Sequence, residues 1–117
     1  MIKTRTLTIS DIKDIVRIEN EAWGKELSAS RNVLIERLKR FPEGFIGAYV
    51  EDRLAGMIYG HPINNVGRTW HENSCKEAFD SKGDIYYIVN LGISEAYLKR
   101  GIGSRLLEET KKLRSRF

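Results

Sequence analysis

The sequence predicts an α/β (α+β) fold, in which a mixed, largely antiparallel sheet is flanked by helices. Two segments, 12–23 and 102–117, carry apolar residues at helical spacing. Between them lie two β-leaning runs separated by three polar residues, typical of a hairpin, and a strongly apolar run over 85–93. The predicted order is strand, helix, helix, strand, strand, strand, helix, which indicates a layered α/β sandwich.

The chain begins with a strand and a helix. Ile2–Ile9 alternates weakly and predicts a first or edge strand. Thr8 or Ser10 can cap the helix that follows, because a short hydroxyl side chain accepts a hydrogen bond from the first turn. Gly24 ends this helix, since glycine readily adopts the left-handed conformation found at helix ends.

A second helix and the hairpin come next. The helix begins at Ser28 or Ser30 and stops at Pro42, because proline lacks the amide hydrogen that a helix needs. Phe45–Val50 and Leu54–Gly60 are the two strands of the predicted hairpin.

The second half carries a long loop, the most apolar strand and a final helix. Ile63–Gly83 has no clear period and is long for a connection between strands. Ile85–Ile93 is apolar almost throughout, which predicts a strand buried on both faces and therefore central in the sheet. Gly101 opens the last helix, whose buried side we expect to carry Ile102, Leu106, Thr110, Leu113 and Phe117.

Length and composition limit the classes of function. The chain has 117 residues, enough for one core, so we expect a single domain over 1–117. No apolar run is long enough to span a bilayer, and no signal peptide is evident at the N-terminus. Cys75 is the only cysteine, which excludes an internal disulfide and a cysteine-based metal site and favours a cytoplasmic location. We expect no metal site and no contact with a membrane.

The net charge of +4 is concentrated at the C-terminal end of the chain. Residues 99–117 contain seven basic and two acidic residues, so the remainder is close to neutral. This distribution fits a solvated helix face or an anion-binding end. A basic nucleic-acid-binding domain is a further interpretation, although no aromatic residue interleaves with these charges before Phe117.

The segment Asn90–Leu107 carries the clearest chemistry. A strand runs through a short turn into a helix whose first turn holds Gly101 and Gly103. The first backbone amides of a helix have no partner, and the helix dipole adds positive charge there. Glycine leaves these amides accessible, and Lys99 and Arg100 add full charges beside them. The pattern predicts a site for a diphosphate.

Two other phosphate-binding motifs do not fit this segment. A Walker-type loop ends in Gly-Lys-Ser/Thr, whereas Gly103 is followed by Ser104 and Arg105. A dinucleotide-binding loop needs a third glycine where this chain has Leu106. The two glycines alone also fit a turn that lets a helix and a strand pack closely.

The wider segment resembles the acetyl-coenzyme A motif of the GCN5-related N-acetyltransferase (GNAT) family, Gln/Arg-x-x-Gly-x-Gly/Ala after an aliphatic strand. Leu98 departs from the motif, because it stands where the family has glutamine or arginine. Phe41–Gly44, Thr69–Glu72 and Gly83–Tyr86 further resemble acetyltransferase domains that occur beside carbon–nitrogen hydrolases. The positions that match the motif are Ile93, Tyr97, Arg100, Gly101, Gly103, Ser104, Leu106 and Leu107.

The resemblance implies an acyl-CoA N-acyltransferase-like fold. It also implies acetyl-coenzyme A (acetyl-CoA) as cofactor and a primary amine of a small molecule or peptide as acceptor. The pantetheine arm would lie along Asn90–Ile93, in a strand that has a bulge in this family, and we expect the bulge at Gly92. The cofactor-binding residues it implies are Leu91, Gly92, Ile93, Leu98, Lys99, Arg100, Gly101, Ile102, Gly103 and Ser104.

The sequence defines a catalytic base less clearly. Asp84 and Tyr87 lie early in the predicted central strand, and His61 ends the preceding strand, where it can face the acceptor. Each also fits an ordinary surface or structural residue. Further candidates are His71 and Glu72 in the long loop, and Trp23 and Trp70 as walls of an acceptor pocket.

In the family, the proton donor is usually a tyrosine on a later helix, beyond a further strand. The sequence ends at Phe117, before both, so we expect a C-terminally truncated fold. An unpaired central strand would be an exposed edge, from which we expect a homodimer. A non-catalytic CoA-binding domain of the same fold is the alternative to an active enzyme.

Overall fold

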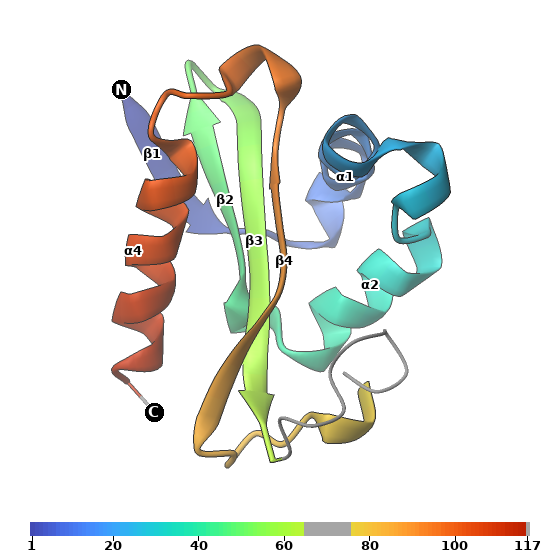
Figure 1. Ribbon diagram of the computed structural model, residues 1–117, viewed down its shortest axis with the longest axis vertical. Helices are drawn as coiled ribbons and strands as arrows, with labels where there is room; N and C mark the ends of the chain where they lie inside the picture. The colour runs from blue at the N-terminus through green and yellow to red at the C-terminus, as the bar shows by residue number, and fades with distance from the viewer. Residues whose placement is uncertain (65–75, 117) are drawn as a thin grey trace.

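The computed structural model describes residues 1–64 and 76–116, in which a four-stranded sheet has helices on both faces. Helices α1 (Ile12–Leu27) and α2 (Arg31–Arg40) cover one face, and α4 (Ile102–Arg114) covers the other (Figure 1). The neighbouring strands are all antiparallel, in the order β1 (Ile2–Thr6), β2 (Phe45–Val50), β3 (Arg53–Ile63) and β4 (Ile85–Ile93). Short 3-10 turns cover Ile9–Asp11, Pro42–Gly44 and Glu95–Tyr97. The predicted antiparallel sheet between helices is therefore confirmed.

The helix boundaries between the first helix and the hairpin agree closely with those predicted from the sequence. Gly24 has a φ of 75° and separates the body of α1 from a last turn that ends at Leu27. Helix α2 begins after Ser30, whose hydroxyl accepts a 3.2 Å hydrogen bond from the Val33 amide. This bond satisfies one of the free amides of the first turn, so Ser30 rather than Ser28 is the cap.

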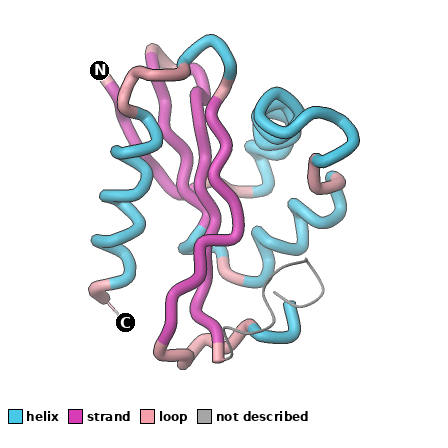
Figure 2. The backbone as a smooth tube through the Cα atoms, viewed as in Figure 1, coloured by secondary structure: helices cyan, strands magenta, loops and turns pink. Residues whose placement is uncertain are grey.

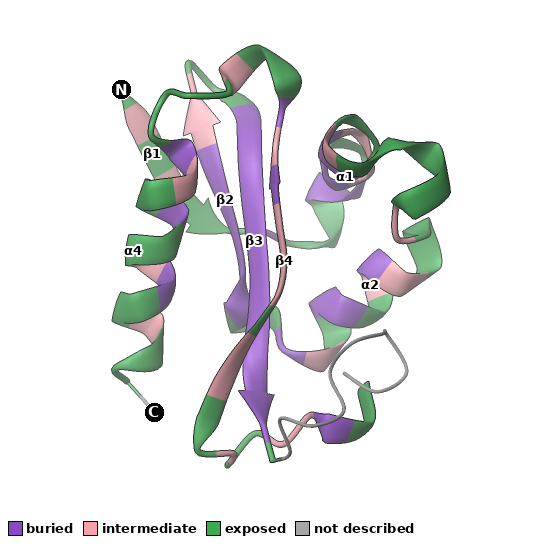
Figure 3. Cartoon of the chain, viewed as in Figure 1, coloured by how far each residue is buried: buried purple, intermediate pink, exposed green. Residues whose placement is uncertain are grey.

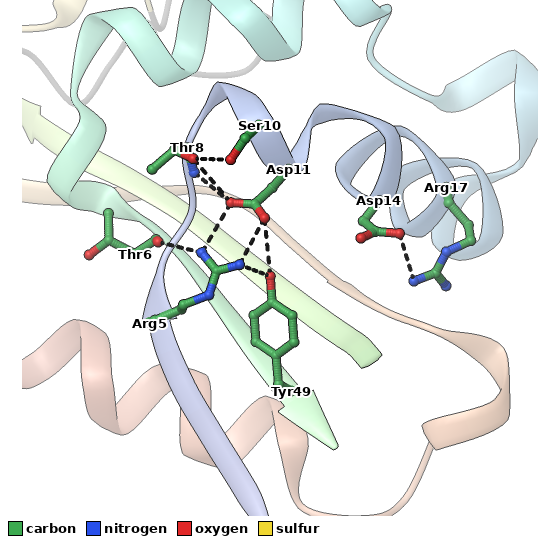
Figure 4. A network of polar contacts seen from close by, with 8 residues as sticks. All are labelled: Arg5, Thr6, Thr8, Ser10, Asp11, Asp14, Arg17 and Tyr49. Carbon is green, nitrogen blue, oxygen red and sulfur yellow. Dashed lines mark hydrogen bonds and ion pairs between the residues drawn. The ribbon is translucent and has the colours of Figure 1, made fainter. Parts of the chain in front are cut away.

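A carboxylate network holds the start of α1 to β1 and β2 (Figure 4). Asp11 accepts two hydrogen bonds from the Arg5 guanidinium, at 2.8 and 3.1 Å, and one from the Thr8 amide at 2.8 Å. Arg5 also donates to the hydroxyl of Tyr49 over 2.6 Å. The Arg5 guanidinium holds the pKa of the Asp11 carboxyl below its usual value. This network fixes the direction in which α1 leaves the sheet.

The two faces of the sheet have separate apolar cores. Strand β3 lies between them and is buried along nearly its whole length (Figure 3). The predicted buried side of α4 is confirmed at Ile102, Leu106 and Thr110. The core under α1 and α2 includes Leu7, Ile15, Ile18, Leu34, Phe45, Met57 and Tyr59, and the core under α4 includes Ile46, Ala48, Ala55, Ile58, Ile102 and Leu106.

Strand β4 is the outermost strand of the described sheet, and the prediction that it is central was wrong. Its side chains are exposed or partly buried, and Ile85 and Ile88 are 43% and 39% exposed. Strands β2 and β3 are the inner strands of the described sheet instead. An apolar run does not by itself distinguish a strand covered on both faces from an outer strand, because apolar residues also occur at partly covered positions.

The hairpin between β2 and β3 closes on two residues. Glu51 and Asp52 both have positive φ, 50° and 67°, as the two central residues of a type I′ hairpin turn require. Strand β3 is longer than expected at both ends, and β1 ends at Thr6 rather than Ile9.

Some residues singled out in the sequence are not among those that the structure describes. Thr69, Trp70, His71, Glu72, Cys75 and Phe117 lie outside the described residues. Within the described ranges, the helices are too short or too polar to cross a membrane.

Candidate active site

The predicted phosphate loop lies between the end of β4 and the start of α4. Gly101 is the N-cap of α4, with a φ of 80°. Within the described part of the chain, the amides of Ile102, Gly103 and Ser104 have no protein acceptor, and no side chain caps the helix. The first turn of this 13-residue helix therefore offers three backbone donors.

The approach to these donors is open. Apart from the chain neighbours and, for Gly103, the backbone of its own helix, no described heavy atom lies within 4 Å of a Cβ built on Gly101 or Gly103. Lys99 and Arg100 are exposed on the loop, and the Arg100 guanidinium lies 5.3 Å from the centre of the Tyr97 ring. Backbone donors, the positive end of the helix dipole and two cations together suit a diphosphate. The residues present therefore fit the phosphates that a CoA cofactor would bring.

Strand β4 has a bulge on the way to this loop. Tyr59 of β3 pairs with Asn90, whereas the next residue, Gly60, pairs with Ile88, so that Val89 is an extra residue in β4. The trace of β4 bends at mid-length (Figure 2). Although they are consecutive, Val89 and Asn90 both line a cavity on the side of α1 and α2.

The bulge is not at Gly92, where the sequence analysis placed it. Gly92 pairs regularly with Met57 of β3. Its role in the structure is close packing, because a Cβ on Gly92 would lie 3.3 Å from the Cβ of Ala22 on α1. The position of the bulge depends on the register between β4 and β3. This register cannot be predicted from the sequence of β4 alone.

The cavity beside the bulge has a volume of about 470 Å³ and lies between α1, the start of α2 and β4. Two of the described lining residues are charged, and both lie on the helices and are buried: Glu19 is 3% exposed and Arg37 is 7% exposed. Arg37 also lies over the Tyr59 ring, 6.0 Å from its centre. The lining residues are Glu19, Trp23, Leu27, Ser28, Ala29, Ser30, Val33, Arg37, Val89 and Asn90.

A chain of hydrogen bonds orders the polar wall of the cavity. The Trp23 indole donates to Asn90 Oδ1 over 2.9 Å, and Asn90 Nδ2 donates to Glu19 Oε1 over 2.6 Å. The other carboxylate oxygen, Glu19 Oε2, accepts from the Ala29 amide over 2.7 Å. A carboxylate has about four acceptor positions, so Glu19 retains capacity for a further donor.

Comparison with known proteins identifies the fold that carries this arrangement. Residues 11–113 match the Acetyltransferase (GNAT) family, and the match includes both the phosphate loop and the walls of the cavity. The chain belongs to the GNAT family.

Relatives and solved structures agree with this assignment. The chain is 27% identical over 114 residues to the uncharacterized N-acetyltransferase YkwB of Bacillus subtilis (strain 168). This alignment covers 88% of this chain and 50% of that protein. It is similar to the loading GNATL domain of CurA from Lyngbya majuscula, with a TM-score of 0.86, 22% identity, and coverage of 97% of this chain and 58% of that one. It is also similar to the GphF GNAT-like decarboxylase in complex with isobutyryl-CoA, with a TM-score of 0.85, 24% identity, and coverage of 92% and 56%. The two structures show the fold alone, and this chain spans about half the length of these relatives.

The GNAT residues predicted to bind the cofactor form one continuous region. Leu91, Gly92 and Ile93 end strand β4, and 98–104 form the loop and the first turn of α4. Leu98 is 56% exposed on this loop, at the position where the family has a polar side chain. The main-chain donors do not depend on that side chain.

The three predicted catalytic residues lie away from the cavity. His61 is fully buried in β3, with Nδ1 3.1 Å from the Pro62 carbonyl oxygen and Nε2 3.4 Å from the Arg40 side chain. Tyr87 is the register partner of His61 on β4. Asp84 is exposed just before β4 and lines a different cavity. Their catalytic roles therefore stay predictions.

Two residues of the cavity wall, Glu19 and Asn90, were missed by the sequence analysis, which did propose Trp23. A signal for Glu19 was present: it lies in the apolar stripe of α1, four residues after Ile15 and four before Trp23. A carboxylate on the buried side of a helix needs partners and therefore marks a candidate site. Asn90 gave no such signal, because its orientation depends on the bulge.

Proposed function

We propose that this chain is the cofactor-binding and acceptor-binding part of an N-acetyltransferase that acts on a primary amine of a small molecule or peptide. The observation that supports this most is that one strand, β4, carries an open phosphate loop at its end and a cavity beside its bulge. When bound, acetyl-CoA supplies an acetyl group activated as a thioester.

In this proposal the loop residues hold the cofactor. The amides of Ile102, Gly103 and Ser104 bind the diphosphate, and Lys99 and Arg100 add electrostatic attraction. The main chain of residues 90–93 holds the pantetheine arm. A bulge disturbs the ladder of hydrogen bonds with the neighbouring strand, which makes main-chain groups near Val89 candidates to bind the thioester carbonyl.

The cavity beside Asn90 receives the acceptor amine. An amine attacks only when it is neutral, so a nearby group must take its proton. Glu19 is the carboxylate among the described residues that line the cavity, and its negative charge attracts an ammonium ion. We assign Glu19 as the proton acceptor, Asn90 as the residue that orients it, and Trp23 as an aromatic wall that favours a cationic ligand.

Calorimetric titration and a transfer assay test the proposal. The chain should bind CoA, and free thiol should appear when acetyl-CoA is mixed with an amine acceptor. Absence of CoA binding would count against the cofactor site. Binding without transfer to any of a broad amine panel would instead favour the non-catalytic CoA-binding domain, an alternative consistent with the exposed Leu98 and with the half-length match to relatives.

A further inference from the structure

The turn that follows β4 is tied to two other elements, α1 and β3, by a single serine. Ser94 is 2% exposed, and its hydroxyl donates to Glu21 Oε1 on α1 over 2.7 Å. Its amide donates to the Ala55 carbonyl of β3 over 2.8 Å, and its carbonyl accepts from the Tyr97 amide over 2.9 Å. Ser94 therefore fixes the point from which the cofactor loop departs.

The partner of Ser94 is itself held in place. Arg17, one turn earlier on α1, donates to Glu21 Oε2 over 3.0 Å and to the Leu54 carbonyl of β3 over 2.9 Å. The Ser94 hydroxyl lowers the pKa of Glu21, with a further contribution from Arg17, against the opposing effect of burial. A charged carboxylate makes a stronger hydrogen bond than a neutral acceptor does.

Between Ser94 and the first turn of α4 the loop has few other buried attachments. Ser94 and Ile102 are buried, at 2% and 1% exposure, whereas 95–101 are exposed or partly buried. At one end the loop is attached by the apolar contacts of Ile102, and at the other by the hydrogen bonds of Ser94 to Glu21 and to the Ala55 carbonyl. The helix that carries Glu21 also carries Glu19 and Trp23, which wall the cavity.

We infer that Glu21 and Ser94 are a positioning pair, which sets the phosphate loop at a fixed place relative to the cavity wall on α1. Neither residue touches the cofactor or the acceptor in this assignment. The inference rests on the proposed function, because the ligand of the loop is the cofactor proposed there.

The test compares Ser94→Ala, Glu21→Ala and the double variant with the unmutated chain. We expect each single variant to raise the Kd for CoA about three- to tenfold, the range that one lost hydrogen bond to a charged group commonly gives. The double variant should bind CoA no more weakly than Glu21→Ala, because that change already removes the hydrogen bond to Ser94 together with the contact to Arg17. Glu21→Gln keeps an acceptor oxygen and should recover most of the affinity, and Glu26→Ala, an exposed carboxylate on the same helix, should change nothing.

Hydrogen exchange without ligand separates positioning from general stability. We expect faster exchange in 95–101 of Ser94→Ala, with the β3 amides unchanged. A lower Tm with unchanged CoA affinity and unchanged exchange in the loop would overturn the positioning role. If the unmutated chain did not bind CoA, the proposed function would fail, whereas exchange in the loop would still decide for or against the pair.

Discussion

Asn90 Nδ2 donates a 2.6 Å hydrogen bond to the Glu19 carboxylate and thereby joins the bulge of β4 to the first helix. The two residues are 71 positions apart in the sequence. Because the Trp23 indole occupies the other end of the same amide, the orientation of Asn90 is fixed from both sides. The polar wall of the cavity therefore depends on a single side chain of the strand.

Replacing Asn90 by alanine should lower the rate of acetyl transfer without weakening the binding of the cofactor. The change leaves Glu19 Oε1 and the Trp23 indole without their partner, so the carboxylate loses its fixed orientation. We expect kcat/KM for the amine to fall roughly ten- to hundredfold, as for loss of one hydrogen bond to a buried charge. The Kd for CoA should stay within about twofold. Asn32→Ala, an exposed asparagine on α2, is the control, and equal losses in both variants would contradict the assignment.

Gly103→Val should block cofactor binding and leave the fold intact. The space around a Cβ at this position is open, so valine fits the protein but covers the backbone donors of the first turn. Little change in stability is expected, because the helix propensity of valine is slightly better than that of glycine, by roughly 0.3 kcal/mol. We expect the Kd for CoA to rise more than about tenfold. Glu108→Val, exposed later in the same helix, is the control, and unchanged CoA binding by the Gly103 variant would refute the loop as the phosphate site.

Asp11→Asn should reduce stability at neutral pH and make the free energy of unfolding less dependent on pH in the acidic range. Asp11 has a lowered pKa in the folded chain, so the unfolded chain takes up the proton first as the pH falls. The stabilisation is complete above the unfolded value of about 3.9 and is lost as the pH drops through the folded pKa. We expect a loss of about 1–2 kcal/mol at pH 7.

Urea unfolding between about pH 7 and pH 2 measures this difference. The two chains should converge in stability at the acid end. Asp14→Asn is the matched control, because Asp14 is half exposed and makes one 3.6 Å ion pair with Arg17. A constant difference between Asp11→Asn and the unmutated chain at every pH would contradict the role of the Asp11 charge.

Gly92→Val should destabilise the contact between α1 and β4 more than Gly92→Ala does. The alanine Cβ would lie 3.3 Å from the Ala22 Cβ, a tight contact that a small shift relieves, whereas the branched side chain of valine needs more room. We expect a cost of about 1–3 kcal/mol for valine and less for alanine. Thermal unfolding measures both, and equal Tm values for the two variants would show that α1 does not pack as closely as described.

The sequence predicts the backbone of the loop between β4 and α4 well because its signals are local. The glycines, the strand before them and the helix after them are adjacent in the chain, and α4 begins after Gly101 as expected. The caps at Gly24 and Ser30 are predictable for the same reason. Each of these features depends on a few consecutive residues and on the backbone conformations they favour.

Other features depend on pairing between distant segments. The bulge at Val89 arises from the register of β4 against β3, and the outer position of β4 depends on which strands lie beside it. His61 illustrates the same point, because its ring packs between Tyr59 and Phe79 rather than beside the cavity. The alternation of apolar and polar residues along one strand does not predict contacts with distant segments.

The extra residue Val89 has a consequence for the outer edge of the sheet. A strand added from another molecule needs an uninterrupted row of donors and acceptors, and a bulge shifts that row by one position. β4 therefore presents two short stretches, 85–88 and 90–93, whose hydrogen-bonding groups are out of phase. The same irregularity that turns Asn90 toward α1 would also interrupt the pairing of any further strand laid along β4.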